Sequence, residues 1–277
     1  MTTTAKSPNA GSAPAAPRVD CIADSAGGLT FDVIATADTD ATLVLRRQGA
    51  GPGADVRLPL TPAAEGLLRA VLPSTVDLAE GIWDACLRFG EGAEQRLEPG
   101  VRDLRALVDR APGPDAERIA VRIPYPAASG ALVVRSWLRR PHAETGTIGF
   151  DGASVTVQGR LYGAQLGPES AVEARLRGAG GRVHRVGASA DGDGGGFTFT
   201  LPYAPLAEGL DAKEWLWDLW LLPGPDGPAV RLARILDDVL LKQAIFVYPG
   251  RKAGSAVVRP YYTGANDLSV RADAART

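Results

Sequence analysis

The clearest pattern in the chain is an alternation of apolar and other positions in short runs. In residues 29–33 every second side chain is a large apolar one, and the same period recurs in residues 56–60 and 82–89. A period of two places alternate side chains on opposite faces of a β-strand. These runs recur roughly every ten residues between turns rich in glycine and proline, which is typical of an antiparallel β-sandwich. The pattern therefore predicts an all-β fold.

Two stretches depart from this alternation. Residues 101–110 carry apolar side chains at positions 101, 104, 107 and 108, a spacing that predicts a short helix. Residues 1–17 contain mainly threonine, serine, alanine, glycine and proline, and we expect a disordered tail there. The folded part accordingly begins at residue 18.

Several short motifs occur twice in the same order, which predicts a tandem duplication. Leu78-Ala-Glu-Gly81 recurs as Leu206-Ala-Glu-Gly209, and Trp83-Asp84 recurs as Trp217-Asp218. A run with Tyr-Pro, a glycine turn and Val-Val-Arg lies within residues 123–137 and recurs within residues 246–261, so that residues 131–137 match residues 255–261. We therefore predict two tandem β-sandwich domains, at residues 18–143 and 144–277, each closed by a hairpin.

The two copies of the tryptophan strand differ on the face opposite the core. The first copy places Ile82, Asp84, Cys86 and Arg88 there, and the second places Leu216, Asp218, Trp220 and Leu222. Since an apolar outer face favours association, we predict that Leu216, Trp220 and Leu222 contact the other domain, another subunit or an insertion. A shifted register, or a strand that lies between two sheets, would explain the same pattern.

Charge and hydropathy exclude two classes of partner. Charged residues make up 22% of the 277 residues and the net charge is −2, so we expect no nucleic acid. No apolar run is long enough for a membrane-spanning helix. The first 18 residues lack the apolar centre of an export signal, so we expect a cytoplasmic protein with reduced cysteines. A disulfide between Cys21 and Cys86 stays open at this point.

Motifs for catalysis are absent, and the sequence predicts no catalytic residue, metal site or cofactor. Two cysteines and two histidines leave little material for a metal site, and His142 and His184 are expected at the surface. Residues 191–196 begin like a calcium loop but lack its terminal glutamate, which favours a hairpin turn.

The carboxylates have a structural interpretation. Asp84 and Asp218 recur beside a recurring arginine, Arg96 and Arg231, and this favours a structural ion pair in each copy over a catalytic role.

Exposed aromatic rings give a second functional hypothesis, since sandwich modules bind sugars by stacking on them. We consider Trp137, Tyr261 and Tyr262 as candidate glycan contacts, with Trp220 as a further candidate ring. The other tryptophans are assigned to packing.

Several runs carry a resemblance to a known family: Ile123-Pro-Tyr-Pro126, Val133-Val-Arg-Ser-Trp137 and Val258-Arg-Pro-Tyr-Tyr262, together with residues 141–144, 231–238, 247–249 and 267–270. They resemble the β-rich accessory regions of actinobacterial cell-wall glycopolymer transferases of the teichoic-acid type. The resemblance implies tandem immunoglobulin-like domains that serve oligomerisation, in some cases as trimers. We expect no nucleotide-sugar domain within these 277 residues, so only the accessory role is carried over.

We therefore expect a non-catalytic accessory module that forms a homo-oligomer or positions a transferase partner in cell-envelope glycopolymer synthesis. The alternatives are a carbohydrate-binding module and an enzyme associated with a glycosyltransferase.

Overall fold

The structure is a computed structural model, and it describes residues 16–34, 40–51, 53–113, 115–178, 181–191 and 195–275. These residues are nearly all in β-strands and the turns between them, as the sequence predicts. Apart from residues 16 and 17, the tail expected at residues 1–17 lies outside the described residues. No helix within the described ranges is long and apolar enough to cross a membrane.

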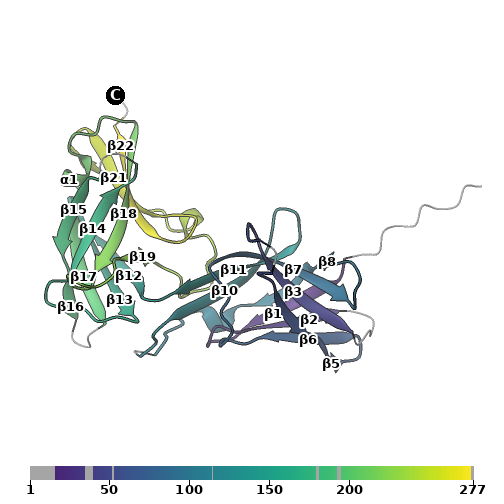
Figure 1. Cartoon of the computed structure of the whole chain (residues 1–277). Coiled ribbons are helices and arrows are strands. Elements are labelled where there is room, and N and C mark those ends of the chain that lie inside the picture. Colours follow the sequence, from purple (N-terminus) through teal and green to yellow (C-terminus); the bar gives the residue numbers. More distant parts are fainter. Residues whose placement is uncertain are drawn as a thin grey trace, which may run out of the picture.

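Two sheets build the N-terminal half, residues 16–139 (Figure 1). One sheet has the order β5-β6-β2-β1-β9, and the other has the order β10-β11-β7-β3-β4 with β8 beside β7. The elements are β1 (Arg18–Ala23), β2 (Leu29–Ile34), β3 (Ala41–Arg47), β4 (Val56–Pro59), β5 (Thr61–Ala64), β6 (Leu67–Leu72), β7 (Gly81–Phe89), β8 (Gln95–Arg96), β9 (Glu98–Asp103), the 3₁₀ turn η1 (Arg105–Leu107), β10 (Ile119–Pro126) and β11 (Leu132–Arg139).

The C-terminal half, residues 142–275, has the strand order β16-β17-β13-β12-β19-β18-β22-β21-β20, with β14 beside β18 and β15 beside β14. Strand β19 pairs with both β12 and β18, so it connects the two layers of this half. The elements are β12 (His142–Phe150), β13 (Ser154–Tyr162), β14 (Ala171–Leu176), β15 (Val183–Gly187), β16 (Ser189–Asp191), β17 (Gly196–Pro202), α1 (Ala204–Ala207), β18 (Glu214–Leu222), β19 (Val230–Ala233), η2 (Lys242–Ala244), β20 (Arg251–Ala253), β21 (Ala256–Tyr262) and β22 (Leu268–Ala274).

The strand pairings of the two halves correspond. Strand β1 pairs with β2 and runs parallel to β9, as β12 pairs with β13 and runs parallel to β19. Strand β7 lies between β3 and β11, as β18 lies between β14 and β22. Trp83 faces Val134 across the β7–β11 pair, and Trp217 faces Val270 across the β18–β22 pair. The two tryptophans therefore occupy equivalent positions.

This register corrects the sequence alignment of the closing hairpins. The alignment matched residues 131–137, most of β11, with residues 255–261, most of β21. In the structure β11 corresponds to β22, and β10 corresponds to β21, so that Pro124-Tyr125 is equivalent to Pro260-Tyr261. The alignment was wrong because a Val-Arg pair occurs in each of these four strands. Only the cross-strand pairing distinguishes the four strands.

Each half has its own hydrophobic core, and one tryptophan is anchored in each. The indole nitrogen of Trp83 donates to the carbonyl oxygen of Ala79 at 3.0 Å, and that of Trp217 donates to the carbonyl oxygen of Leu206 at 3.1 Å. Both acceptors belong to the repeated Leu-Ala-Glu-Gly motif. A buried indole N–H requires an acceptor, and this explains why the motif and the tryptophan recur together.

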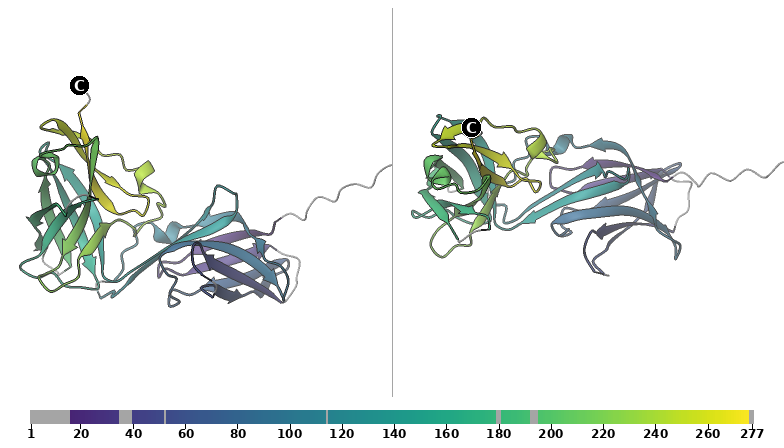
Figure 2. Two further views of the ribbon diagram at one scale, coloured as in Figure 1. Left: turned by 45° about the horizontal axis from the view of Figure 1, so that its top comes forward. Right: turned by 90° about the horizontal axis from the view of Figure 1, so that it is seen from above.

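The two halves lie end to end with a bend between them (Figure 2), and residues of the C-terminal half complete the core of the N-terminal half. Those residues are Tyr162, Ala233, Ile235 and Leu236. The segment after β19 is held there by Glu144, whose carboxylate accepts hydrogen bonds from the backbone N–H groups of Ile235 and Leu236. The halves therefore share apolar packing.

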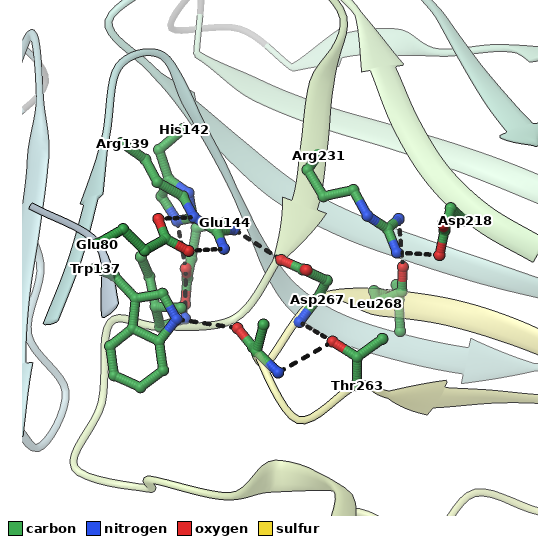
Figure 3. Close-up of polar contacts among 12 residues, drawn as sticks. Glu80, Trp137, Arg139, His142, Glu144, Asp218, Arg231, Thr263, Asp267 and Leu268 are labelled. Atoms are coloured by element: carbon green, nitrogen blue, oxygen red, sulfur yellow. Dashed lines mark hydrogen bonds and ion pairs between the residues drawn. The ribbon is translucent and has the colours of Figure 1, made fainter. Parts of the chain in front are cut away.

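Polar contacts also cross this junction (Figure 3). The guanidinium of Arg139 donates to both carboxylate oxygens of Glu80, at 3.2 and 3.0 Å, and to Asp267 at 2.8 Å. The indole nitrogen of Trp137 donates to the backbone oxygen of Ala265 at 3.0 Å. Ala265 and Asp267 both lie on the turn between β21 and β22, so that this turn is bound to the end of β11.

Three further expectations are corrected or refined here. Residues 101–110 form the end of β9 and the turn η1 instead of a helix, because residues 98–103 pair in parallel with β1. His142 is fully buried, since it stacks on Tyr162 and its Nε2 lies 2.7 Å from Glu144. Cys21 and Cys86 are both free and buried.

Candidate functional site

Strand β18 displays the two faces that the sequence predicts. Trp217, Leu219 and Leu221 are fully buried in the core of the C-terminal half. The predicted interface residues Leu216, Trp220 and Leu222 lie on the opposite, outer face and are half-buried. Their association with a partner stays a prediction.

Arginines of the same half cover the outward-facing tryptophan. The guanidinium carbon of Arg175 lies 5.0 Å from the ring centroid of Trp220, and that of Arg231 lies 5.5 Å from it. Cation–π contact of this kind is favourable at partly exposed sites. The arginines thus explain how the sheet tolerates a tryptophan on its outer face.

Asp218 organises the charges on this face. Its carboxylate accepts hydrogen bonds from Arg177 at 2.6 Å, from Arg231 and from the hydroxyl of Ser269 at 3.1 Å (Figure 3 shows the Arg231 contact). Burial alone would raise the pKa of this carboxyl, but Arg177 and Arg231 hold the pKa below its ordinary value. The predicted ion pair with Arg231 is therefore present.

The corresponding ion pair of the first copy is not formed. Asp84 accepts a hydrogen bond from the side-chain amide of Gln48 at 2.9 Å, so that the expectation of an Asp84–Arg96 pair is corrected. Gln48 directly follows β3, the strand that pairs with β7, and its amide supplies the donor that an arginine was expected to supply.

Tyr261, a predicted glycan contact, lies on the same outer face as Trp220. Cross-strand register places Tyr261 opposite Ser269, and Ser269 opposite Asp218. Tyr261 is half-buried and borders a cavity of about 540 Å³. Two residues that were predicted separately thus lie on one sheet surface.

This cavity combines aromatic rings with hydrogen-bonding groups. It lies between β21 and the segment that follows η2, and it is lined by Gln243, Ala244, Phe246, Val247, Tyr248, Arg259, Pro260, Tyr261 and Arg271. The rings of Phe246 and Tyr248 stack with centroids 6.5 Å apart, and Tyr248 also contacts the buried ring of Tyr262. The aromatic groups are therefore held by the core behind them. We call this space the Tyr261 cavity.

The segment after η2 escaped the sequence analysis. Residues 246–249 were interpreted as an extended arm of the closing hairpin, but no strand is assigned to residues 245–250. The segment exposes Ile245 and Val247, the latter to 82%, and directs Phe246 and Tyr248 toward the core. Its aromatic content was visible in the sequence, but its irregular path was not.

The other two predicted glycan contacts are corrected. Trp137 is 1% exposed, because it closes the junction between the halves, and Tyr262 is fully buried with its hydroxyl 2.9 Å from that of Thr145 (Figure 3 shows Trp137). An enclosed ring has no free face for a sugar to stack on.

The N-terminal half has a cavity of similar volume at a different place. It measures about 550 Å³ and lies between the segment after η1 and the start of β10. Strand β10 is equivalent to β21, but the position of Tyr261 corresponds to Tyr125, near the other end of β10. The described residues that line this cavity include Arg110, Arg118 and Ile119, and none is aromatic.

Candidate metal ligands do not converge within the described part of the chain. No group of three or more histidine, cysteine, aspartate or glutamate side chains is placed to hold a metal ion there. The calcium-loop pattern at residues 191–196 includes residues 192–194, which lie outside the described residues.

Comparison with known proteins gives weak structural similarity only. No family model and no curated protein sequence matches the chain. Among solved structures, residues 217–571 of S. aureus TarS are similar with a TM-score of 0.30 and 13% identity, over 67% of this chain and 56% of that fragment. A pullulanase from Anoxybacillus sp. in complex with maltotriose is similar with a TM-score of 0.24 and 11% identity, over 73% of this chain and 24% of the pullulanase. The chain thus spans about half the length of the TarS fragment.

Proposed function

We propose that the chain is a non-catalytic carbohydrate-binding module that holds a saccharide in the Tyr261 cavity. In this proposal the two halves are tandem immunoglobulin-like sandwich domains at residues 18–143 and 144–277. The boundary would fall just inside β12, which begins at His142.

The observation that carries the proposal is the aromatic lining of the Tyr261 cavity. Phe246, Tyr248 and Tyr261 surround a space of about 540 Å³. The cavity of similar volume in the N-terminal half lies at a different place, and none of the described residues that line it is aromatic. Aromatic rings around an open space support the binding of a ligand with an apolar face.

The chemistry of the lining suits a sugar. The apolar face of a pyranose ring stacks on an aromatic ring such as that of Tyr261, and its hydroxyl groups require polar partners around the rim. Gln243, Arg259 and Arg271 supply amide and guanidinium groups at this cavity. Half-buried Tyr261 is anchored by its strand, so that little side-chain freedom would be lost on binding.

The setting follows from the resemblance of the sequence to accessory regions of cell-wall glycopolymer transferases. We propose that the module acts in the cytoplasm and positions a glycan or a transferase partner during cell-envelope glycopolymer synthesis. The absence of a catalytic role belongs to the same proposal.

A glycan array tests the binding function directly. The full chain should bind at least one class of immobilised oligosaccharide, and Tyr261→Ala should abolish that binding. Tyr125→Ala is the matched control, because Tyr125 occupies the equivalent position in the N-terminal half, and it should leave binding intact. Equal loss in both variants, or the absence of binding to any glycan, would contradict the proposal.

Assembly through the outer face of β18 is the second candidate function. It is supported by the half-buried Leu216, Trp220 and Leu222, whose counterparts in the first copy are Ile82, the smaller Cys86 and the charged Arg88 respectively. Sedimentation at tens of micromolar should then show an oligomer, with a trimer as the form that the resemblance implies, and Trp220→Asp should dissociate it. A monomer that Trp220→Asp leaves unchanged would remove this function.

A further inference from the structure

We propose that the Tyr261 cavity selects uncharged saccharides over acidic ones, and that Asp273 and Glu214 enforce this selectivity by neutralising its two arginines. The inference rests on the proposed function, since it names the ligand class of the same cavity. It concerns two carboxylates that do not line the cavity themselves.

Each guanidinium at the cavity is already paired with a carboxylate. Nη2 of Arg259 lies 3.2 Å from Oδ2 of Asp273. Nε of Arg271 lies 2.6 Å from Oδ1 of Asp273, and its Nη2 lies 2.9 Å from Oε2 of Glu214. Two positive and two negative charges therefore sum to zero at this wall of the cavity.

Other cations near the aromatic rings are paired as well. Arg234, whose guanidinium lies 5.0 Å from the ring centroid of Phe246, forms an ion pair with Asp237 at 3.1 Å. Arg177, which interacts electrostatically with Tyr261, is bound to Asp218 at 2.6 Å. An acidic ligand would thus meet no unpaired guanidinium among the residues named here.

The paired arginines can still donate hydrogen bonds. A guanidinium has more N–H groups than these contacts use, and the remaining groups can donate to hydroxyl oxygens of a ligand. The side chains of Arg259 and Arg271 are 42% and 39% exposed, so those groups are accessible. Asp273 and Glu214 also fix the orientation of the two guanidinium groups.

An acidic saccharide would have to compete for the same two arginines. Its carboxylate would displace Asp273 or Glu214 from a guanidinium, or would lie beside them as a like charge, and either arrangement is unfavourable. A neutral saccharide would keep both ion pairs and add hydrogen bonds to them. The balance of charge therefore favours the neutral ligand.

Titration calorimetry on the full chain tests the inference with two panels of probes, all of them tetrasaccharides. The neutral panel contains cellotetraose, chitotetraose and maltotetraose, and the acidic panel contains tetragalacturonate and tetraguluronate. We expect the tightest neutral probe to bind at least about fivefold more strongly than either acidic probe at low salt. Tyr261→Ala should abolish that binding.

Asp273→Asn supplies the decisive variant because it unmasks positive charge while keeping the shape of the side chain. Affinity for the acidic panel should rise about fivefold at low salt, the gain should fall as salt is added, and neutral binding should be retained. Glu214→Gln should act in the same direction. Asp226→Asn, an equal charge change on an exposed loop, should leave the preference unchanged.

The outcomes separate this inference from the proposed function. Preferential acidic binding that depends on Tyr261 would overturn the neutral selectivity and leave the carbohydrate site standing. An unchanged preference in both Asp273→Asn and Glu214→Gln, with unfolding midpoints equal to that of the wild type, would overturn the role of the two carboxylates. Absence of binding by both panels and by the glycan array would overturn the site itself.

Discussion

The indole nitrogen of Trp137 donates a hydrogen bond to the backbone oxygen of Ala265, across a separation of 128 residues. Trp137 belongs to the last strand of the N-terminal half, and Ala265 belongs to the last turn of the C-terminal half. This bond joins segments from the ends of the two halves. We therefore expect it to couple the unfolding of one half to that of the other.

Trp137→Phe should weaken this coupling. The variant removes the N–H donor and part of the buried ring, and we expect a loss of about 1–3 kcal/mol in the free energy of unfolding. Calorimetry should show the unfolding transition broaden or separate into two. Trp83→Phe is the control, since the bond from Trp83 to Ala79 lies within one half. A broadening that is equal in both variants would contradict the coupling.

Arg139 and Asp267 should show a measurable interaction energy across the junction. Their side chains are 13% and 18% exposed, so water screens the pair only partly. Burial opposes the charge of Arg139, but Glu80 and Asp267 raise the pKa of its guanidinium. A double-mutant cycle with Arg139→Gln and Asp267→Asn should give about 1–3 kcal/mol in urea denaturation. If the losses of stability in the two single variants simply add up to the loss in the double variant, the contact contributes nothing to stability.

The two faces of β18 should respond differently to truncation. Trp217→Ala removes a fully buried ring and should cost about 3–5 kcal/mol in the free energy of unfolding. Trp220→Ala removes a half-buried ring and its contacts with Arg175 and Arg231, and it should cost about 1–2 kcal/mol. Urea titrations monitored by circular dichroism would measure both. The reverse order of costs would contradict the assignment of faces.

Cys21 should make stability depend on pH in the alkaline range. Burial, with a smaller contribution from Asp20, raises the pKa of its thiol from 9.0 to about 12. Above pH 9 the thiol ionises in the unfolded chain but stays protonated in the folded one, so that stability falls as pH rises toward 12. We expect the difference between wild type and Cys21→Ala to change by about 1.4 kcal/mol per pH unit in this window. A constant difference would show that the thiol ionises equally in both states.

Local alternation was sufficient to predict the faces of the strands. The sequence placed Trp217 inward and Trp220 outward because a period of two is a property of neighbouring residues. The all-β composition followed for the same reason. The boundaries of β7 and β18 could be read from the glycine turns and charged residues that flank them.

Long-range contacts account for what the sequence could not predict. Trp137 was interpreted as an exposed ring because its acceptor, Ala265, lies in another part of the chain. The Tyr261 cavity depends on the irregular segment at residues 245–250, and irregular backbone has no periodic signature. The closing hairpins were misaligned by one strand, since pairing decides between similar Val-Arg motifs.

The residues that complete the N-terminal core also determine when this half can finish folding during synthesis. Ala233, Ile235 and Leu236 close that core, but they are synthesised almost a hundred residues after β11 ends at Arg139. Domains generally fold from the N-terminus as the chain leaves the ribosome. Here the emerging N-terminal half has an open apolar end until the segment after β19 has been translated. Chaperones that bind nascent chains would bind that apolar end after β11 has been synthesised and before the segment after β19 has been synthesised.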